Sequence, residues 1–243
     1  MEALKNKVVL VSGGSRGIGA AICAKLSELG AKVAINYNRS FKEAADLAAS
    51  LNGSFTVKGD VSLPEEAQRV VRETLDKYGQ IDILVNNAGY YEMQPIEKSD
   101  LEHFRRIFDL NVLGVVSLVR AAVPHLKSGA RIINISSVAA RARFANAGVY
   151  SASKAALEAL TRCWGQELGP RGILVNCVAP GTTETEMLKT GIDDQTRKHF
   201  ESNTALGRLG TPSDIADVVA FLAGDQSNWL VGQTIDASGG LNI

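Results

Sequence analysis

The chain has 243 residues, enough for an α/β domain with a sizeable core, and 26 basic residues balance 26 acidic ones to give a formal net charge of zero. This balance, without a basic block or an acidic tail, argues against a nucleic-acid partner and against a disordered tail. The longest apolar runs have strand length and the three cysteines lack metal-ligand spacing, so we expect a cytoplasmic protein with no membrane span and no metal site.

Apolar, β-branched runs alternate with helical patterns along the chain. Strands are expected at residues 7–12, 32–36, 54–58, 82–85, 131–135, 173–178 and 234–236, and helices at 18–29, 41–51, 64–77, 100–126, 149–168 and 212–223. Nearly continuous apolar strands separated by helices are typical of a parallel sheet buried on both faces. The sequence therefore predicts one α/β domain over residues 1–243, with a doubly wound parallel sheet of about seven strands.

Two local features refine this scheme. Ser62 is a candidate N-cap for the helix at 64–77, which has Pro64 in its first turn. Residues 182–210 form the one long polar interruption, and we interpret them as a lid-like insertion over the carboxyl edge of the sheet.

The first strand is followed by a glycine-rich loop that opens directly into a helix. The loop reads Ser12-Gly13-Gly14-Ser15-Arg16-Gly17-Ile18-Gly19. Glycines permit a tight turn and a close approach of the backbone to a pyrophosphate, and the N-terminus of the helix attracts its negative charge. A glycine-rich turn without a ligand is the alternative, but the position between a first strand and a helix favours a nucleotide site.

Three polar residues around the fifth strand and the next helix suit proton transfer at a carbonyl or alcohol oxygen. Tyr150 and Lys154 are four residues apart in a helical run, so they lie on one face, one turn apart. An ammonium group beside a phenol favours the phenolate, so we expect Lys154 to lower the pKa of Tyr150 from about 10 toward neutrality. Ser137 follows the strand at 131–135, where a strand end can present a hydroxyl group. The Tyr-x-x-x-Lys spacing alone also occurs on ordinary helix faces, so the assignment depends on the other motifs.

The order of these motifs resembles that of the classical short-chain dehydrogenase/reductase family, over nearly the whole chain. The matching segments are Gly13, Gly17 and Gly19, Asn86-Asn87-Ala88-Gly89, Asn111, the set of Ser137, Tyr150 and Lys154, Pro180-Gly181, residues 207–212, and Ser238-Gly239-Gly240. Ser12 stands where this family more usually has threonine. The resemblance implies a Rossmann fold and an oxidoreductase that acts on CH–OH groups.

In this family the matching polar residues form a catalytic tetrad. The resemblance implies that Tyr150 protonates a carbonyl oxygen as hydride leaves a nicotinamide, that Lys154 lowers the tyrosine pKa and holds the nicotinamide ribose, and that Ser137 positions the substrate oxygen. Asn111 would hold a water that relays protons to Lys154, by keeping its helix locally open. A nicotinamide-binding regulator without chemistry is a remote alternative, because such a protein should have a broken tetrad.

The nucleotide site implied by the resemblance draws on several loops. Its members are Gly13, Ser15, Arg16, Gly17, Ile18, Gly19, Asn38, Arg39, Ser40, Asp60, Val61, Asn87, Ala88, Gly89, Tyr150, Lys154, Pro180, Gly181, Thr183 and Thr185. Asp60 would accept a hydrogen bond from the adenine amino group, and Thr183 and Thr185 would lie near the nicotinamide carboxamide.

The end of the second strand indicates the choice of nucleotide. An NAD site usually has a carboxylate there for the ribose diol, whereas this strand continues as Asn36-Tyr37-Asn38-Arg39-Ser40 with no acid before Glu43. Arg16 and Arg39 could instead form charge-assisted bonds with a 2′-phosphate. We therefore predict NADP(H); the alternative is that Arg39 is only a solvated loop charge.

Two segments should face the substrate, and they leave its identity open. Tyr90 and Tyr91 follow the Asn-Asn-Ala-Gly segment, and Arg143 and Phe144 lie between Ser137 and Tyr150. Aromatic rings there fit a cyclic or aromatic ketone. Arg141 or Arg143 could meet an acidic group or could be solvated.

The overall pattern resembles the 3-oxoacyl-[acyl-carrier-protein] reductases, with Arg171 as a candidate docking residue. The first expectation is accordingly NADPH-dependent reduction of a 3-oxoacyl thioester, as in fatty acid biosynthesis. A small, cyclic or aromatic ketone or a polyol is the alternative substrate. The resemblance also implies a homotetramer, with interfaces at the helices expected at 100–126, 149–168 and 212–223.

Overall fold

The computed structural model of the chain describes residues 3–185, 188 and 193–241. Seven parallel strands form one sheet in the order β3-β2-β1-β4-β5-β6-β7. Their bounds are β1 Val8–Val11, β2 Lys32–Tyr37, β3 Phe55–Lys58, β4 Ile83–Asn86, β5 Arg131–Ile135, β6 Leu174–Pro180 and β7 Thr234–Ala237. The predicted doubly wound α/β fold is confirmed, and each expected strand is present within two residues of its predicted ends.

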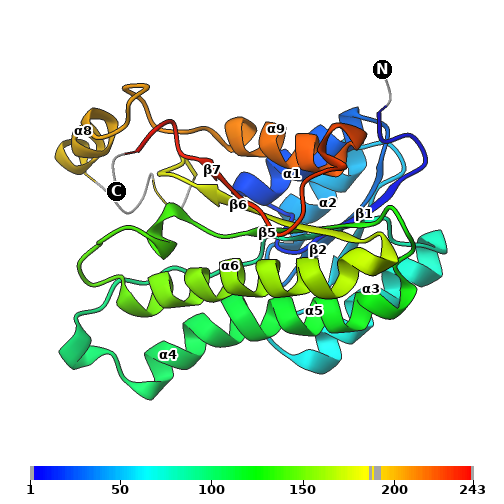
Figure 1. The fold of residues 1–243 in the computed structure, drawn as a ribbon, viewed down its shortest axis with the longest axis horizontal. Helices are drawn as coiled ribbons and strands as arrows, with labels where there is room; N and C mark the ends of the chain where they lie inside the picture. Colours follow the sequence, from blue (N-terminus) through cyan, green and yellow to red (C-terminus); the bar gives the residue numbers. More distant parts are fainter. Residues whose placement is uncertain (1–2, 186–187, 189–192, 242–243) are drawn as a thin grey trace.

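Helices cover both faces of the sheet (Figure 1). The faces carry two separate apolar cores, because successive residues of a buried strand point to opposite sides. On one face α1 Gly17–Glu28, α2 Phe41–Ser50 and α9 Pro212–Ala223 pack against alternate strand residues such as Val9 and Val11. On the other face α3 Pro64–Tyr78, α5 Gly114–Ala122 and α6 Gly148–Leu168 pack against residues such as Leu10.

The helical region predicted at 100–126 is divided into four pieces. It begins at Leu101, because the Asp100 side chain accepts a hydrogen bond from the backbone N–H of His103 and so caps the helix. The pieces are α4 Leu101–Phe108, the π turn η2 Asp109–Leu113, α5, and the 3₁₀ turn η3 Val123–His125.

By length and composition alone this region resembles a membrane span. Leu101–His125 has 25 residues, and an 18-residue window within it has a mean hydropathy of 1.6. In the fold, α5 buries Val115, Leu118 and Val119 against α3 and the sheet. The segment is therefore a core helix of an α/β sandwich, and its apolar character serves packing.

One local expectation is wrong, and one helix was not predicted. The Ser62 hydroxyl bonds to the carboxylate of Asp60, and the N-cap position of α3 is Leu63, which offers no side-chain cap. The polar stretch 182–210 contains a helix that the sequence reading missed, α8 Asp194–Ser202, whose N-terminus is capped by Asp193. The remaining expected helices agree with the structure within one or two residues at each end.

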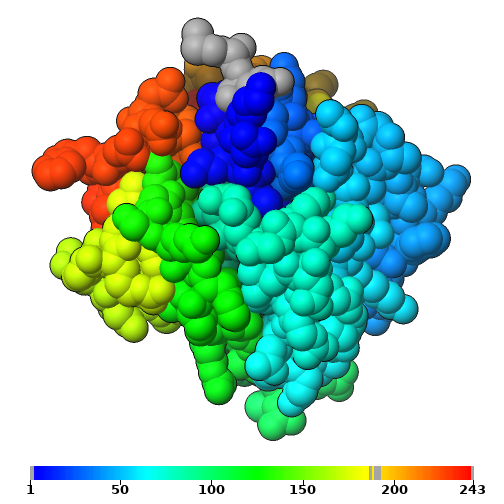
Figure 2. Space-filling view, turned by 90° about the vertical axis from the view of Figure 1, so that its right-hand side faces the viewer, coloured from blue at the N-terminus to red at the C-terminus, as the bar shows by residue number. Residues whose placement is uncertain are grey.

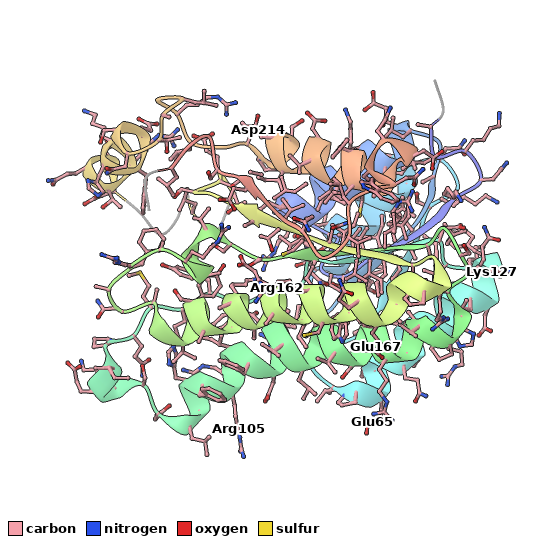
Figure 3. All side chains as sticks on the ribbon, in the orientation of Figure 1. Glu65, Arg105, Lys127, Arg162, Glu167 and Asp214 are labelled. Atoms are coloured by element: carbon pink, nitrogen blue, oxygen red, sulfur yellow. The ribbon has the colours of Figure 1, made fainter. Side chains whose placement is uncertain are left out.

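The two ends of the strands form different surfaces. The face at the amino ends, which Figure 2 shows, is built from the start of the chain and from the segments that precede β4 and β5. Charged side chains such as Glu65, Arg105 and Lys127 lie on the outside of the molecule (Figure 3). The loops after the carboxyl ends, together with α8, lie at the opposite end of the sheet (Figure 1).

Candidate active site

The strand order places a crevice at the carboxyl edge of the sheet. β1 lies between β2 and β4, so the chain leaves β1 toward one side of the sheet and returns on the other. In open α/β sheets this switch of direction separates the two adjacent loops and creates the usual ligand position.

The glycine loop after β1 leaves no space for side chains. Gly13 and Gly17 have φ values of 61° and 56°, in the left-handed region that favours glycine. A Cβ atom on Gly19 would lie 2.2 Å from the carbonyl oxygen of Gly13. Arg16 precedes α1 with an extended backbone, and no side chain caps the helix. The loop and the uncapped first turn therefore fit a pyrophosphate group, which backbone N–H groups can bind.

Ser12 and Asn87 tie this loop to the end of β4. The Ser12 hydroxyl accepts hydrogen bonds from the backbone N–H groups of Asn87 (3.0 Å) and Ala88 (3.1 Å). The Asn87 side chain donates to the carbonyls of Ser12 (3.0 Å) and Gly13 (2.9 Å). The serine that replaces the family's threonine thus retains the hydroxyl group that joins the two sides of the crevice.

Asn36 in β2 has a structural role that the sequence reading missed. Its side chain is 2% exposed, accepts from the N–H of Gly13 (3.3 Å), and donates to the carbonyls of Val57 (3.2 Å) and Gly59 (3.1 Å). It therefore joins the glycine loop to β3. The available signal was a polar residue within an otherwise apolar strand.

Asn38 and Asp60 lie side by side where β2 and β3 end. The Asn38 amide donates to one carboxylate oxygen of Asp60 (2.8 Å), and the hydroxyl of Ser62 donates to the other (2.6 Å). Each carboxylate oxygen can accept more than one hydrogen bond, so Asp60 can still accept from a ligand. Val61 is buried, and Ser40 precedes α2 without a side-chain capping bond.

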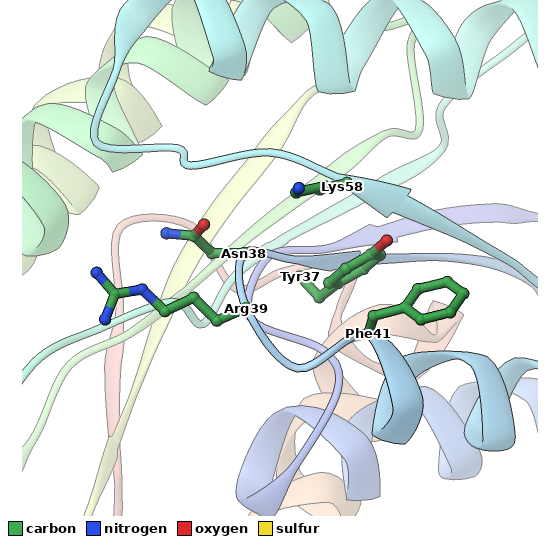
Figure 4. A pocket seen from close by; sticks show the side chains of 5 residues that line it. All are labelled: Tyr37, Asn38, Arg39, Phe41 and Lys58. Carbon is green, nitrogen blue, oxygen red and sulfur yellow. The ribbon is translucent and has the colours of Figure 1, made fainter.

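A surface hollow of about 410 Å³ opens beside these residues (Figure 4). It is lined by Tyr37, Asn38, Arg39, Phe41 and Lys58, so it contains two cations and no carboxylate. Lys58 lines this hollow although the sequence analysis did not name it. The parallel register pairs it with Tyr37, so adjacent strand ends bring Lys58 toward the predicted Arg39.

Ser137, Tyr150 and Lys154 meet at the carboxyl end of β5. Tyr150 lies in the first turn of α6 and shares a hydrogen bond with Ser137. The Ser137 hydroxyl also accepts from the N–H of Ala139 (3.2 Å). Lys154 is 4% exposed, its ammonium donates to the carbonyl of Ile135 (2.9 Å), and its Nζ atom lies 5.8 Å from the centre of the Tyr150 ring.

Burial controls both titratable groups of this set. It raises the pKa of Tyr150 to about 12, although the hydrogen bond with Ser137 acts in the opposite direction. It lowers the pKa of Lys154 to about 8. The expected fall in the tyrosine pKa is therefore wrong for the ligand-free protein, because desolvation of the phenolate outweighs any attraction by the nearby lysine.

Asn111 lies in the π turn η2 and is fully buried. Its side chain accepts from the N–H of Tyr90 (2.7 Å) and donates to the carbonyl of Tyr90 (2.9 Å) and to the hydroxyl of Ser153 (3.0 Å). The wide π turn agrees with a locally open helix. Asn111 thus holds the start of one predicted substrate segment against α6.

The segment after β6 reaches back to the glycine loop. Pro180 ends β6, and a Cβ atom on Gly181 would lie 2.8 Å from the Cα atom of Ser238. A β-bridge between Thr183 and Gly210 closes the base of the stretch 182–210, six residues of which (186–187 and 189–192) lie outside the described residues. The methyl group of Thr185 would lie 3.5 Å from a Cβ atom on Gly17.

The two predicted substrate segments lie side by side. The N–H of Gln94 donates to the carbonyl of Asn146 (2.7 Å). The Tyr91 ring meets the Tyr150 ring edge to face, with ring centres 4.8 Å apart. Tyr90, Tyr91 and Phe144 are 38–43% exposed. The Tyr91 ring therefore offers an apolar surface beside Tyr150, and Tyr90 and Phe144 are exposed on the same two segments.

Two predicted surface cations are already engaged within the protein. Arg171 donates to the backbone carbonyls of Val123 (2.8 Å) and Leu126 (3.2 Å). Arg141 forms ion pairs with Asp236 and Glu158, so its charge is already paired within the protein and not directed at an acidic group of a substrate. Arg143 is exposed.

Comparison with known proteins identifies the family. A family model described as enoyl-(acyl carrier protein) reductase matches residues 13–242. An uncharacterized oxidoreductase of Methylorubrum extorquens is 44% identical over 99% of this chain and 100% of its own length. The chain belongs to the short-chain dehydrogenase/reductase family. It is an oxidoreductase by fold and by family.

Other relatives of this short-chain dehydrogenase/reductase have more specific names. A hydroxynaphthalene reductase of Aspergillus fumigatus is 33% identical over 95% of this chain and 90% of its own. A short-chain dehydrogenase from Burkholderia cenocepacia, solved in complex with NADP, superposes with a TM-score of 0.94 at 35% identity, covering 99% of this chain and 100% of the other. The angucycline C-6 ketoreductase LanV, solved with bound NADP, gives a TM-score of 0.92 at 36% identity, covering 98% and 96%.

Proposed function

We propose that this protein is an NADP(H)-dependent reductase that converts a bulky cyclic or aromatic ketone into a secondary alcohol. The observation that carries the proposal is the Tyr91 ring, packed edge to face on Tyr150 beside the exposed ring of Tyr90. Aromatic side chains favour flat apolar ligands through offset or edge-on contacts. The names of the A. fumigatus hydroxynaphthalene reductase and of LanV support the same class of substrate.

The choice of NADP(H) rests on donor chemistry. The glycine loop suits a pyrophosphate, because it makes a tight turn and no side chain caps the first turn of α1, whose N–H groups can bind an anion. Arg39 and Lys58 line the hollow at the ends of β2 and β3, and none of its five lining residues carries a carboxylate that would favour a ribose diol. These cations would hold the 2′-phosphate by charge-assisted hydrogen bonds, and Arg16 adds charge on the other side of the loop. NADP is named in the titles of two similar structures.

In the proposed reaction the bound nicotinamide supplies the hydride to the carbonyl carbon of the ketone. Tyr150 then has to donate a proton to the carbonyl oxygen, and with a pKa of about 12 its phenol keeps that proton across the neutral range. Ser137, which shares a hydrogen bond with Tyr150, would hold the same oxygen.

Lys154 would bind the nicotinamide ribose. One of the three hydrogens of its ammonium goes to the Ile135 carbonyl, which leaves two for ribose hydroxyls. Gly89 keeps this space open, because a Cβ atom there would lie 3.3 Å from Nζ. The bonds of Asn111 to Tyr90 and Ser153 would hold the substrate segment in place, and its predicted water-mediated relay to Lys154 is part of the proposal.

We also propose a cytoplasmic homotetramer. Leu101 (63% exposed), Phe104 and Leu113 (about 40% each) present apolar side chains on α4 and the π turn, and Trp229 (98%) does so near β7. Exposed apolar groups of this kind are typical of surfaces buried by association.

The proposal is tested by initial rates of NADPH and NADH oxidation with a bicyclic aromatic ketone, a cyclic diketone, an acetoacetyl thioester and a sugar ketone. We expect NADPH with the bicyclic ketone to give the highest kcat/KM. A higher value with the thioester would contradict the ring-ketone proposal and support the 3-oxoacyl expectation. In that case residues other than Arg171, which bonds to carbonyls of the protein itself, would have to bind the acyl carrier protein.

A further inference from the structure

A charged cluster behind the catalytic residues joins three parts of the chain that are distant in sequence. Glu158 lies on α6 one turn after Lys154 and is 7% exposed. The hydroxyl of Ser136 lies within hydrogen-bond distance of the Glu158 carboxylate (3.2 Å) and of the Lys154 carbonyl (3.1 Å). Burial raises the pKa of Glu158, and the nearby Arg141 opposes this shift. A buried carboxylate without a cation would be costly, so this position requires a partner.

Arg141 supplies that partner from the loop between Ser137 and Tyr150. Its Nε atom lies 3.6 Å from a Glu158 oxygen, and its two terminal nitrogens bond to both carboxylate oxygens of Asp236. The planar guanidinium fits such forked pairing, which fixes direction as well as distance. Because Arg141 and Asp236 are both about 40% exposed, their pairing should contribute more to geometry than to stability.

Asp236 connects this loop to the polar stretch 182–210. It lies in β7, opposite Ala179 of β6. Just after β7, the carbonyls of Gly239 and Gly240 accept hydrogen bonds from Leu206 (3.1 Å) and Ala205 (3.3 Å), which follow α8. A displacement of the loop that carries Arg141 would therefore also displace β7, whose following residues bind the end of the stretch 182–210.

We propose that Arg141 is a positioning residue that fixes the substrate wall of the site without touching the substrate. Its fork holds the segment 141–147, which carries Phe144, against α6 and β7. Gln94 is bonded to Asn146 of the same segment, so the wall that contains Tyr91 is held as well. This inference rests on the proposed ketone reduction, in which these walls receive the ring of the substrate.

The expected effect is selective. Lys154 and Ser137 have bonds of their own that do not involve Arg141, to the Ile135 carbonyl and the Ala139 N–H, and the Tyr150 ring packs on Tyr91. The Arg141→Met and Asp236→Asn variants should therefore raise KM for the ketone about tenfold, the scale of effect expected when a positioning contact is lost. At the same time kcat should change less than about twofold, and NADPH affinity should be unchanged.

A matched control is Arg69→Met. Arg69 lies on α3 and also bridges two carboxylates, those of Glu66 and Glu73. It donates as well to the backbone carbonyl of Lys58 (2.9 Å), so the NADPH affinity of this variant is measured beside its KM for the ketone. This variant should leave KM for the ketone unaltered. Arg141→Lys keeps the charge but loses the forked pairing, so its KM for the ketone should lie between those of the wild type and of Arg141→Met. The double variant Arg141→Met/Asp236→Asn should match Arg141→Met, because Arg141→Met already removes the only part of the pairing that Asp236→Asn affects.

Hydrogen–deuterium exchange provides a readout that does not depend on turnover. Arg141→Met should increase amide exchange in 141–147 and in β7, and Arg69→Met should not. If the wild-type protein reduces no ketone, the proposed function fails while the exchange measurement still decides the positioning role. Equal exchange and equal KM in the Arg141 and Arg69 variants would overturn the inference. A decrease in the kcat of Arg141→Met with an unchanged KM would also overturn the inference, because that result would place Arg141 in the chemical step.

Discussion

Tyr150 and Lys154 show how one side-chain environment can set two protonation states. Both are withdrawn from water on the same face of α6, and burial disfavours the charged form of each. In the ligand-free protein this keeps the phenol protonated and makes the ammonium easier to deprotonate. A reductase needs a proton on the phenol at the start of the reaction, so the environment suits reduction.

Replacing Tyr150 with Phe should lower kcat about 100-fold to 10,000-fold, the usual contribution of a positioned general acid. The ring and its contact with Tyr91 remain, so NADPH should bind as in the wild type. Initial rates and a fluorescence titration with NADPH would measure the two effects. Tyr78→Phe, which removes a hydroxyl bonded to the Gly53 carbonyl far from the crevice, is the control and should keep its turnover. Normal turnover in Tyr150→Phe would refute the assignment.

The pH dependence of nucleotide binding should report Lys154. Its pKa of about 8 means that the ammonium is present below pH 8 and is lost as the pH rises above it. NADPH affinity should therefore fall between pH 8 and pH 9, while Tyr150 remains protonated until about pH 12. The measurement is the dissociation constant of NADPH at a series of pH values. In Lys154→Met the affinity for NADPH should be lower and independent of pH over this range. If the affinity of this variant still falls between pH 8 and pH 9, the fall is due to another group.

The members of the proposed catalytic set could be named from the sequence, but the residues that they bond to could not. Ser137, Tyr150 and Lys154 lie together as expected, because a strand end and a helical spacing, taken with the order of the other motifs, indicate their places. Asn36 and Lys58 were missed, because their roles depend on which strands are neighbours. The sequence also could not show which cations are available to a partner. Arg171 was expected to be one, but it bonds to carbonyls 45 and 48 residues earlier in the chain.

At the scale of elements, the carboxyl ends of β2 and β3 together supply the two cations, Arg39 and Lys58, of the proposed 2′-phosphate site. Arg39→Asp combined with Lys58→Met should weaken NADPH binding at least about 100-fold, because each charge-assisted bond contributes about 1.5–3 kcal/mol. NADH, which lacks the 2′-phosphate, should be affected little. The ratio of the two dissociation constants measures the effect, with the exposed Arg105→Met on α4 as a control. An unchanged ratio would mean that the phosphate is held elsewhere.

Helix boundaries illustrate what local patterns can and cannot reveal. The start of α9 was predicted correctly at Pro212, and there Thr211 and Asp214 form a reciprocal capping box. The start of α3 at Pro64 was also correct, but its supposed cap Ser62 turned instead toward Asp60. The interruption at Asp109–Leu113 has no local signal, because a π turn is stabilised by what Asn111 binds across the fold.

For the whole molecule, the alternation of strands and helices predicted a parallel sheet, whereas association has to be measured. We expect Phe104→Glu to shift the protein from a tetramer to smaller species, because it introduces a charge into the proposed apolar interface. Sedimentation velocity would detect the change. Ile96→Glu, at an apolar residue that is 85% exposed outside that helix face, is the control. If the wild-type protein sediments as a monomer, the homotetramer proposal is wrong.

The π turn also sets the rotational phase of the helices on either side of it. An α-helix turns about 100° per residue, so one extra residue in a turn rotates everything beyond it by that angle. This allows α4 to bury His103 and Ile107 while α5 buries Leu118 and Val119. A one-residue deletion within Asp109–Leu113 would therefore act at a distance, by turning one of the two helices so that its polar side faces the sheet.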